Sequence, residues 1–217
     1  MTDPATVFSR LGGRRGLIDG GVPPLLFAVA NAGAAALGHA DRALASAVIL
    51  AGASALALGT LRRVQGASLA GVLRGLLMTV TAAAFALWTG RARDFFLPGM
   101  YVDAVWAMGL ALSALIGHPF VGHAYAALFQ AGGAWRDDPR LRRVLAAATW
   151  GLSGTYALRV GVQAALYRAD EPALLALAKL ALGWPLSAVV VVLTLRAVRS
   201  ARRAGAAGRE RATVARQ

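Results

Sequence analysis

The sequence of 217 residues contains no cysteine. This absence excludes disulfide bonds, thiolate metal sites and a cysteine nucleophile. Histidine is scarce as well, with three residues in the chain. His118 and His123 are five positions apart, whereas zinc ligands on one helix face are three or four apart, and no third ligand is near them in the sequence. We therefore expect no bound metal ion and no cofactor.

The motifs that mark common enzyme classes are also missing. No serine lies in a GxSxG nucleophile elbow, and no glycine-rich loop resembles a phosphate-binding loop. An active site assembled from scattered residues in a membrane would leave no such motif, but nothing in the sequence nominates one. We expect a protein that is not an enzyme.

Acidic side chains are few, because 10 aspartates and glutamates stand against 23 basic residues, which gives a net charge of +13. Such an excess suggests nucleic acid as a partner when the basic residues form one face of a soluble fold. Here the arginines lie mostly between long apolar runs and at the C-terminal end, as in membrane proteins whose loops are sorted by charge. We therefore expect no nucleic-acid partner.

Apolar residues, by contrast, make up 58% of the chain, and the mean hydropathy is +0.58. A soluble domain is about 45–50% apolar, and a chain of this length lacks the interior volume to bury the excess. Six apolar runs approach the length of about 20 residues that a membrane-spanning helix needs. They are residues 22–39, 43–61, 69–89, 97–117, 144–166 and 173–195. The sequence predicts an all-α, polytopic transmembrane helical bundle with six spans.

The arginines predict the orientation of this bundle. The N-terminal segment, the second and fourth loops and the C-terminal tail together carry 16 arginines, and the opposite side carries four. Since basic loops stay in the cytoplasm, both termini are predicted to be cytoplasmic. We divide the chain into an N-terminal segment (1–21), a six-span domain (22–195) and a basic tail (196–217).

The two ends are expected to be peripheral. Asp3 and Pro4 predict the start of a short helix over 4–11, which the following glycines end. The first apolar run is too long for a signal-peptide core, so we interpret it as an uncleaved span. After about residue 204 we expect a disordered tail whose arginines contact anionic lipid at the membrane surface, with retention of topology as the simpler interpretation.

Each turn on the outer side carries an aspartate just before the next span, at Asp41, Asp94 and Asp170. An aspartate in this place caps the free N–H groups of the following helix and meets the positive end of its dipole. Two inner turns also share the sequence Leu-Arg-Arg-Val. This pattern suggests three helical hairpins in a row, although capping residues and inner arginines would converge without a repeat.

Other positions predict local features. Aromatic residues within 120–135 indicate a short interfacial helix in the fourth loop. Arg74 lies near the inner end of its span and is expected to extend to the cytoplasm. Gly71 and Gly75 would let another helix approach closely, and Pro185 predicts a kink in the last span.

Ionisable side chains inside a span are costly, so each one needs an explanation. Asp103, Arg159 and Lys179 are predicted to lie at one depth, about 10 Å below the outer surface, since each residue adds about 1.5 Å along a helix. Gln163 is one turn from Arg159 and could join them. We expect either a polar pocket, open to the outer side, that holds an anionic lipid headgroup or small anion, or an ion pair that links three helices. A further alternative is that the long side chains extend to the membrane interface.

Several segments together resemble a known group of proteins. The resemblance is carried by residues 12–31 (GGRRGLIDGGVPPLLFAVAN), 89–107, 116–122 (IGHPFVG), 135–152 and 156–167. They are similar to an uncharacterised family of actinobacterial membrane proteins, which is remotely similar to the intracellular septation proteins of bacterial inner membranes. The septation proteins share an Asp-then-Pro first span, a Pro-containing entry to a middle span and an inner Pro turn. The residues at these places are Asp19, Pro23, Phe95, Phe96, Pro98 and Pro119.

The resemblance implies a non-enzymatic scaffold or accessory factor in envelope maintenance or septation, in the bacterial plasma membrane. Its implied partners are membrane lipids and other membrane proteins of division or envelope synthesis, and the sequence leaves a homo-oligomer open. Lys179 resembles a lysine in the final span of the septation proteins, but Leu97 stands where they have another lysine. The rival function is a small transporter, channel or lipid carrier whose path is lined by the charged residues within the spans.

Overall fold

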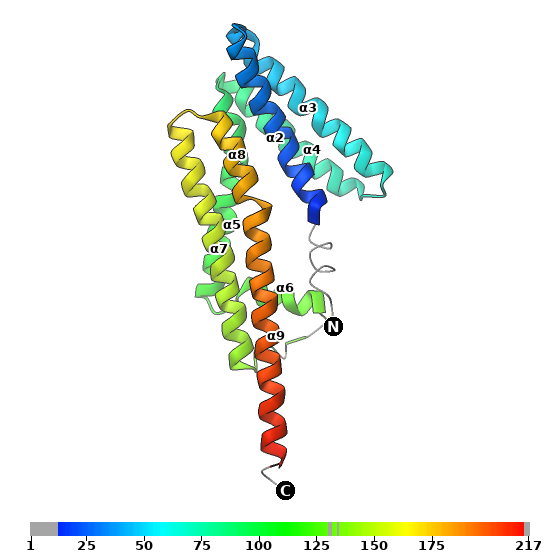
Figure 1. Cartoon of the computed structure of the whole chain (residues 1–217), viewed down its shortest axis with the longest axis vertical. Coiled ribbons are helices and arrows are strands. Elements are labelled where there is room, and N and C mark those ends of the chain that lie inside the picture. Colours follow the sequence, from blue (N-terminus) through cyan, green and yellow to red (C-terminus); the bar gives the residue numbers. More distant parts are fainter. Residues whose placement is uncertain (1–12, 130–131, 134, 215–217) are drawn as a thin grey trace. The chain divides into compact units, whose positions relative to one another are not determined.

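The computed structural model describes residues 13–129, 132–133 and 135–214 (Figure 1). The short helix predicted over residues 4–11 lies outside them. All regular structure in the described part of the chain is helical, which confirms the all-α fold class. The elements are α2 (Gly13–Ala36), α3 (Ala40–Val64), α4 (Leu69–Thr89), the 3₁₀ helix η1 (Ala92–Phe96), α5 (Leu97–Leu115), α6 (Phe120–Phe129), α7 (Pro139–Arg168), α8 (Pro172–Leu182) and α9 (Trp184–Val214).

Four helical segments of the described chain are long and apolar enough to cross a membrane, namely Ala40–Val64, Leu69–Thr89, Ala92–Leu115 and Pro172–Ala201. They support an integral membrane protein. Two of the six predicted spans do not meet this criterion. The first lies in α2, of which the stretch Gly21–Ala36 counts as a shorter apolar helix.

The fifth predicted span lies in α7, which is long enough but too polar along one face. Its buried polar residues are Thr149, Ser153, Thr155, Arg159 and Gln163. Most of them are about one turn apart, so they form a polar stripe on the helix. Within a membrane, such residues face other helices rather than lipid. This stripe explains why α7 has a low hydropathy although most of its polar groups are hidden.

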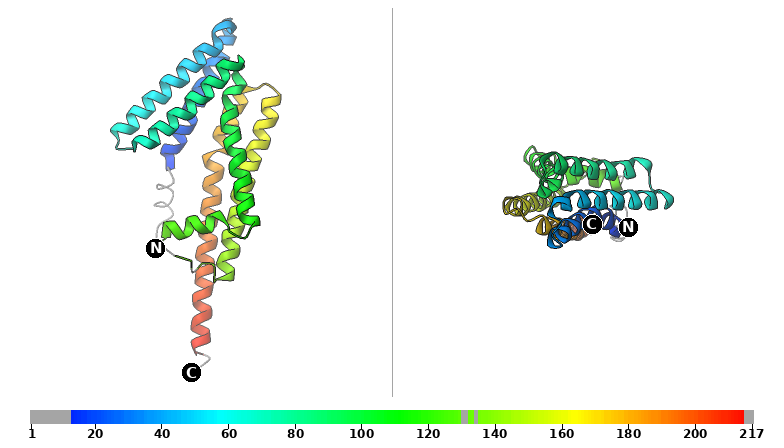
Figure 2. Two further views of the ribbon diagram at one scale, coloured as in Figure 1. Left: turned by 180° about the vertical axis from the view of Figure 1, so that it is seen from behind. Right: turned by 90° about the horizontal axis from the view of Figure 1, so that it is seen from above.

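The chain forms two compact units, one from residues 1–104 and 158–184 and the other from residues 105–157 and 185–217. In the first unit, α2 packs on α3 and α8, and α3 lies antiparallel beside α4 (Figures 1 and 2). One face of α3 carries buried small residues at every fourth position: Ala43, Ala47, Ala51, Ala55 and Gly59. Small residues let neighbouring helix backbones approach closely, which is the usual way in which membrane helices pack.

Three phenylalanines form the aromatic core of the first unit. The rings of Phe27 in α2 and Phe95 in η1 stack with centroids 4.0 Å apart. Phe96 meets both rings edge-on, at 6.1 Å from Phe27 and 5.5 Å from Phe95. Phe27 and Phe96 are fully buried. The two residues predicted from the family resemblance, Phe95 and Phe96, therefore have a structural role, because they hold η1 against α2.

The second unit has its own core, in which Tyr125 of α6 and Trp135 pack with Leu141, Leu145 and Val198. The predicted helix in the fourth loop is thus present as α6, but Tyr125 within it and Trp135 after it are buried in protein. The indole of Trp135 covers Gly122 so closely that a Cβ atom there would lie 2.6 Å from the ring. Glycine at this position is what allows the indole to reach the backbone of α6.

The last helix is longer than we predicted. α9 remains helical to Val214, beyond residue 204, where we expected the chain to lose regular structure. Alanine and arginine dominate this part of the sequence, and both are strong helix formers.

Candidate functional site

The last predicted span is broken in the middle. α8 ends at Leu182 and α9 begins at Trp184, so Gly183 stands between two helices. Pro185 lies two residues further on and has no N–H group to offer to the carbonyl of Ala181, four residues earlier. The predicted kink is therefore a complete interruption, which leaves carbonyl groups at the C-terminal end of α8 without helical donors.

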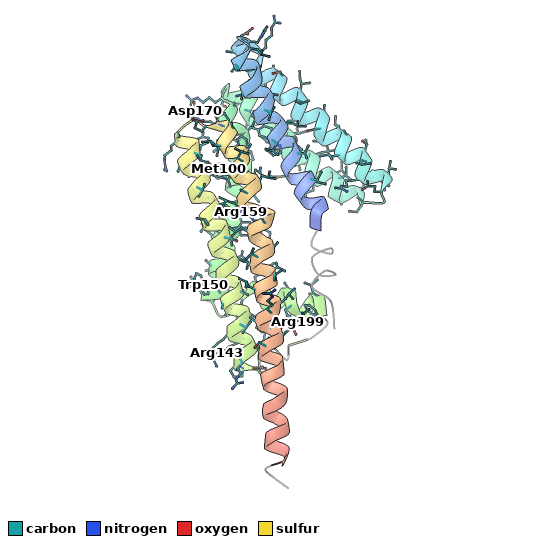
Figure 3. The ribbon with its side chains drawn as sticks, viewed as in Figure 1. Met100, Arg143, Trp150, Arg159, Asp170 and Arg199 are labelled. Atoms are coloured by element: carbon teal, nitrogen blue, oxygen red, sulfur yellow. The ribbon has the colours of Figure 1, made fainter. Side chains whose placement is uncertain are left out.

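Arg159 of α7 satisfies the carbonyl groups that the break exposes. Its Nε donates to the carbonyl of Leu182 at 2.5 Å, and its Nη2 donates to the carbonyl of Gly183 at 2.6 Å. Figure 3 shows Arg159 on α7 at the level where α8 ends. A guanidinium group is suited to this place because its donors are rigidly arranged and its charge meets the negative end of the α8 dipole.

Asp103 of α5 completes this arrangement. Its Oδ1 lies 3.8 Å from Nη1 of Arg159, and its Oδ2 accepts a hydrogen bond of 3.4 Å from Nε2 of Gln163. Gln163 is fully buried, and Arg159 is 9% exposed. The residues predicted to share one depth are therefore brought together, and Asp103, Arg159 and Gln163 form a paired group that fixes α7 to the end of α8.

Lys179 of α8 lies beside this group but is placed differently. Among the described residues, its Nζ has no ion-pair partner within 4.0 Å and no hydrogen bond. The ammonium lies close to the backbone of α5, since a Cβ atom at Gly99 would be 3.0 Å from Nζ. The ring centroid of Phe96 is 6.0 Å away. Lys179 therefore packs against α5 and Phe96, and the carboxylate of Asp103 is beyond ion-pair distance from its ammonium.

Two cavities meet at Lys179. One, of about 250 Å³, is also lined by Asp103, Arg159 and Gln163. The other, of about 360 Å³, is lined by Lys179 together with Arg74 of α4 and mostly apolar residues of α2 and α4. Sequence analysis missed Arg74 as a member of the site, because we expected it to extend away to the cytoplasm. Whether Arg74 lies near α8 depends on how α4 is inclined in the folded protein, and hydropathy does not predict that inclination.

The glycine pair of α4 has a different role from the one predicted. Gly71 and Gly75 line the cavity that contains Lys179 and Arg74, and they also line a neighbouring cavity of about 240 Å³. A Cβ atom at Gly75 would have no neighbour within 4 Å. Gly75 thus borders open space instead of the backbone of another helix, whereas a Cβ atom at Gly71 would lie 3.1 Å from Oγ of Ser68.

The aspartates of the outer turns do not cap as predicted. The N-cap residues are His39 for α3 and Glu171 for α8, and neither has a side-chain capping bond. Asp41 lies one position inside α3, where its charge still meets the helix dipole. Asp94 is buried in η1 and accepts a hydrogen bond from the hydroxyl of Tyr167.

Asp170 and Asp94 are connected through Arg93. Arg93 Nη1 lies 3.7 Å from Asp170 Oδ1, and Arg93 Nε lies 4.0 Å from Asp94 Oδ1. The guanidinium also lies over the ring of Tyr167, 4.9 Å from its centroid. Instead of capping helices, these aspartates connect the turn before α5 to the end of α7 and the turn before α8.

The other residues named for the family resemblance lie within or next to helices. Pro23 is buried within α2 and lines the Arg74 cavity, and Pro98 lies in the first turn of α5. Pro119 is fully buried just before α6. The side chain of Asp19 lies outside the described residues.

The two histidines of the fourth loop stack with ring centroids 6.2 Å apart, and His123 Nε2 lies 3.0 Å from Arg136 Nη2. No group of three potential metal ligands is found among the described side chains.

Comparison with known proteins identifies one relationship. The model of DUF3159, a family of proteins of unknown function, matches residues 11–205. No curated protein and no solved structure matches the chain. The part of the resemblance that pointed to an uncharacterised family is thereby supported, whereas the remote link to septation proteins has no support from these comparisons.

Proposed function

Because this chain belongs to the DUF3159 family, whose function is unknown, we propose a function from its own geometry: it is a non-enzymatic integral membrane protein that binds an anion at Lys179. The observation that carries this proposal is the position of the Lys179 ammonium, which lines two cavities without an ion-pair partner among the described residues. The function class is that of a small transporter or lipid carrier.

The balance of charge supports an anionic ligand. The positive charge of Arg159 is offset by Asp103 and by the carbonyl groups at the end of α8. Lys179 then leaves one positive charge in excess. An uncompensated ammonium within a bilayer is costly, and a bound anion at the cavity would offset that cost. Broken helices with polar groups at the break are also typical of substrate sites in membrane transporters.

The topology that we propose with this function has six spans and two cytoplasmic termini in a bacterial plasma membrane. The polar stripe of α7 favours an interior helix of the bundle, where a low hydropathy is tolerated. The bias of arginines between the two sides of the chain favours cytoplasmic termini.

The proposal predicts that Lys179→Met weakens anion binding at least about tenfold, which corresponds to ~1.4 kcal/mol. The measurement is equilibrium binding of inorganic phosphate and of short-chain phosphatidylglycerol to the purified protein in zwitterionic nanodiscs. Lys179→Arg keeps the charge and should retain most of the affinity. Arg168→Met removes an exposed cation from the end of α7 and serves as the matched control, which should bind like the wild type.

Two results would overturn the proposal: wild-type protein that binds neither probe, or a Lys179→Met variant that binds both as well as the wild type does. In that case the better candidate is the scaffold or accessory role in envelope maintenance or septation. That candidate is favoured by Lys179, which resembles the final-span lysine of the septation proteins. It requires septum placement or envelope permeability to change in cells that lack the gene, and to recover when the gene is restored.

A further inference from the structure

We infer that the cavity between Arg74 and Lys179 holds the phosphate of an anionic phospholipid, and that an acyl chain of this lipid lies over Gly71 and Gly75 in the adjoining cavity. This inference rests on the proposed anion site at Lys179 and names its ligand class. Arg74 becomes a lipid-binding residue, which was not apparent from the sequence.

The charged residues that line the cavity favour an anionic headgroup. Its described lining contains two charged residues, Arg74 and Lys179, and both are cationic. Asp103 lines the other cavity, where it pairs with Arg159. A phosphodiester in this cavity would therefore find two cations and no described carboxylate in the lining. Basic pockets between membrane helices are known to bind anionic lipid headgroups in this way.

The mostly apolar lining of the cavity favours an amphiphilic ligand over a free ion. Apart from the two cations and Thr79, the lining consists of prolines, glycines, Met78, Ala82 and Phe95. These side chains offer few groups that could replace the water around a small hydrated anion. They offer apolar surface to the carbon atoms next to a lipid phosphate.

The second cavity provides the place for an acyl chain. Both cavities are lined by Pro23, Gly71, Gly75 and Thr79, so they adjoin along α4. Beyond the shared residues, the second cavity is lined by apolar side chains of α3 and α4, including Leu58, Val72 and Leu76. The missing side chain at Gly75 leaves this passage open, since nothing lies within 4 Å of its Cβ position.

The test compares three variants in detergent-purified protein by native mass spectrometry and by thermal stabilisation with added lipid. Arg74→Met is expected to weaken phosphatidylglycerol binding about tenfold relative to wild type, because one of two charge-assisted contacts to the phosphate is lost. Arg91→Met, which removes an exposed cation outside both cavities, is the control for general charge and should change binding less than about twofold.

Gly75→Leu tests the position of the chain. The new side chain should fill the passage without a clash and weaken phosphatidylglycerol binding about tenfold. Since Gly75 also lines the phosphate cavity, inorganic phosphate should lose affinity too, but several-fold less than the lipid does. Phosphatidylcholine, which has no net charge, should bind at least about tenfold more weakly than phosphatidylglycerol to the wild type.

The outcomes separate this inference from the proposed function. If Lys179→Met weakens phosphate binding but Arg74→Met and Gly75→Leu leave phosphatidylglycerol binding unchanged, the anion site stands and the lipid inference is wrong. If Arg74→Met weakens both probes equally and Gly75→Leu weakens neither, the ligand is a free anion. If Lys179→Met changes nothing, both proposals are wrong.

Discussion

Replacement of Arg159 by methionine is expected to lower the free energy of unfolding by about 3–5 kcal/mol, the usual cost of removing one partner from a buried ion pair. The variant loses the two hydrogen bonds to the carbonyls of Leu182 and Gly183. It also leaves the carboxylate of Asp103 without its nearest cation. Reversible unfolding by sodium dodecyl sulfate in mixed micelles measures the difference from wild type.

Two further variants show where this loss comes from. Arg159→Met combined with Asp103→Asn removes the orphaned charge, and should recover part of the stability that the single variant loses. The stability that the double variant does not recover measures the contribution of the hydrogen bonds from Arg159 to the end of α8. Arg168→Met, on the exposed end of the same helix, should change stability by less than about 0.5 kcal/mol. A single Arg159→Met variant as stable as the Arg168→Met control would show that Arg159 does not stabilise the break.

The second large effect is expected for Phe96→Ala, which should destabilise the protein by about 2–3 kcal/mol. Lipid is as apolar as a protein core, so the loss comes from packing rather than from transfer out of water. Phe96 is fully buried and contacts Phe27 and Phe95 edge-on. A cavity of ~100 Å³ at about 24 cal/mol per Å³ gives this magnitude.

The same unfolding assay checks the prediction for Phe96. Leu77→Ala is a suitable control, because Leu77 is 65% exposed and its loss should cost less than about 0.5 kcal/mol. If Phe96→Ala were no more destabilising than Leu77→Ala, the aromatic cluster would not be a packed core, and its residues would need another explanation.

The fold class and the composition of the charged group could be predicted from the sequence, because both follow from strong local signals. Long apolar runs predict membrane helices, and rare ionisable residues at equal depth predict a common site. The different roles of the two cations in that site could not be predicted. It depends on which of the two cations, Arg159 or Lys179, reaches the carbonyls at the break near Gly183.

Other features were missed for physical reasons. The polar stripe of α7 has a low hydropathy although it is buried, so a count of apolar residues does not distinguish it from a surface helix. The complete break at Gly183 requires glycine and Pro185 to act together, and proline alone predicted a kink. The contribution of Arg74 to the site depends on how α4 is tilted, which helical periodicity does not determine.

Lys179 is the single lysine of the chain, whereas all other basic side chains among the 23 are arginines. An ammonium group is a compact, strongly hydrated charge that rotates freely, whereas a guanidinium group presents a rigid fork of donors. The structure uses each cation accordingly. Arg159 caps fixed carbonyl groups, and Lys179 lines the two cavities in which we propose that an anion binds.

The single lysine also permits a direct measurement on the unaltered protein. Reductive methylation with formaldehyde and borohydride modifies amines and keeps their charge. Any methylated side chain must be Lys179, since the other amine of the chain is its N-terminus. The account predicts that Lys179 is modified in zwitterionic lipid, and that phosphatidylglycerol at ten times its Kd slows the modification about tenfold. Equal rates in the two lipids, or no modification in either, would contradict the claim that Lys179 lines an open anion site.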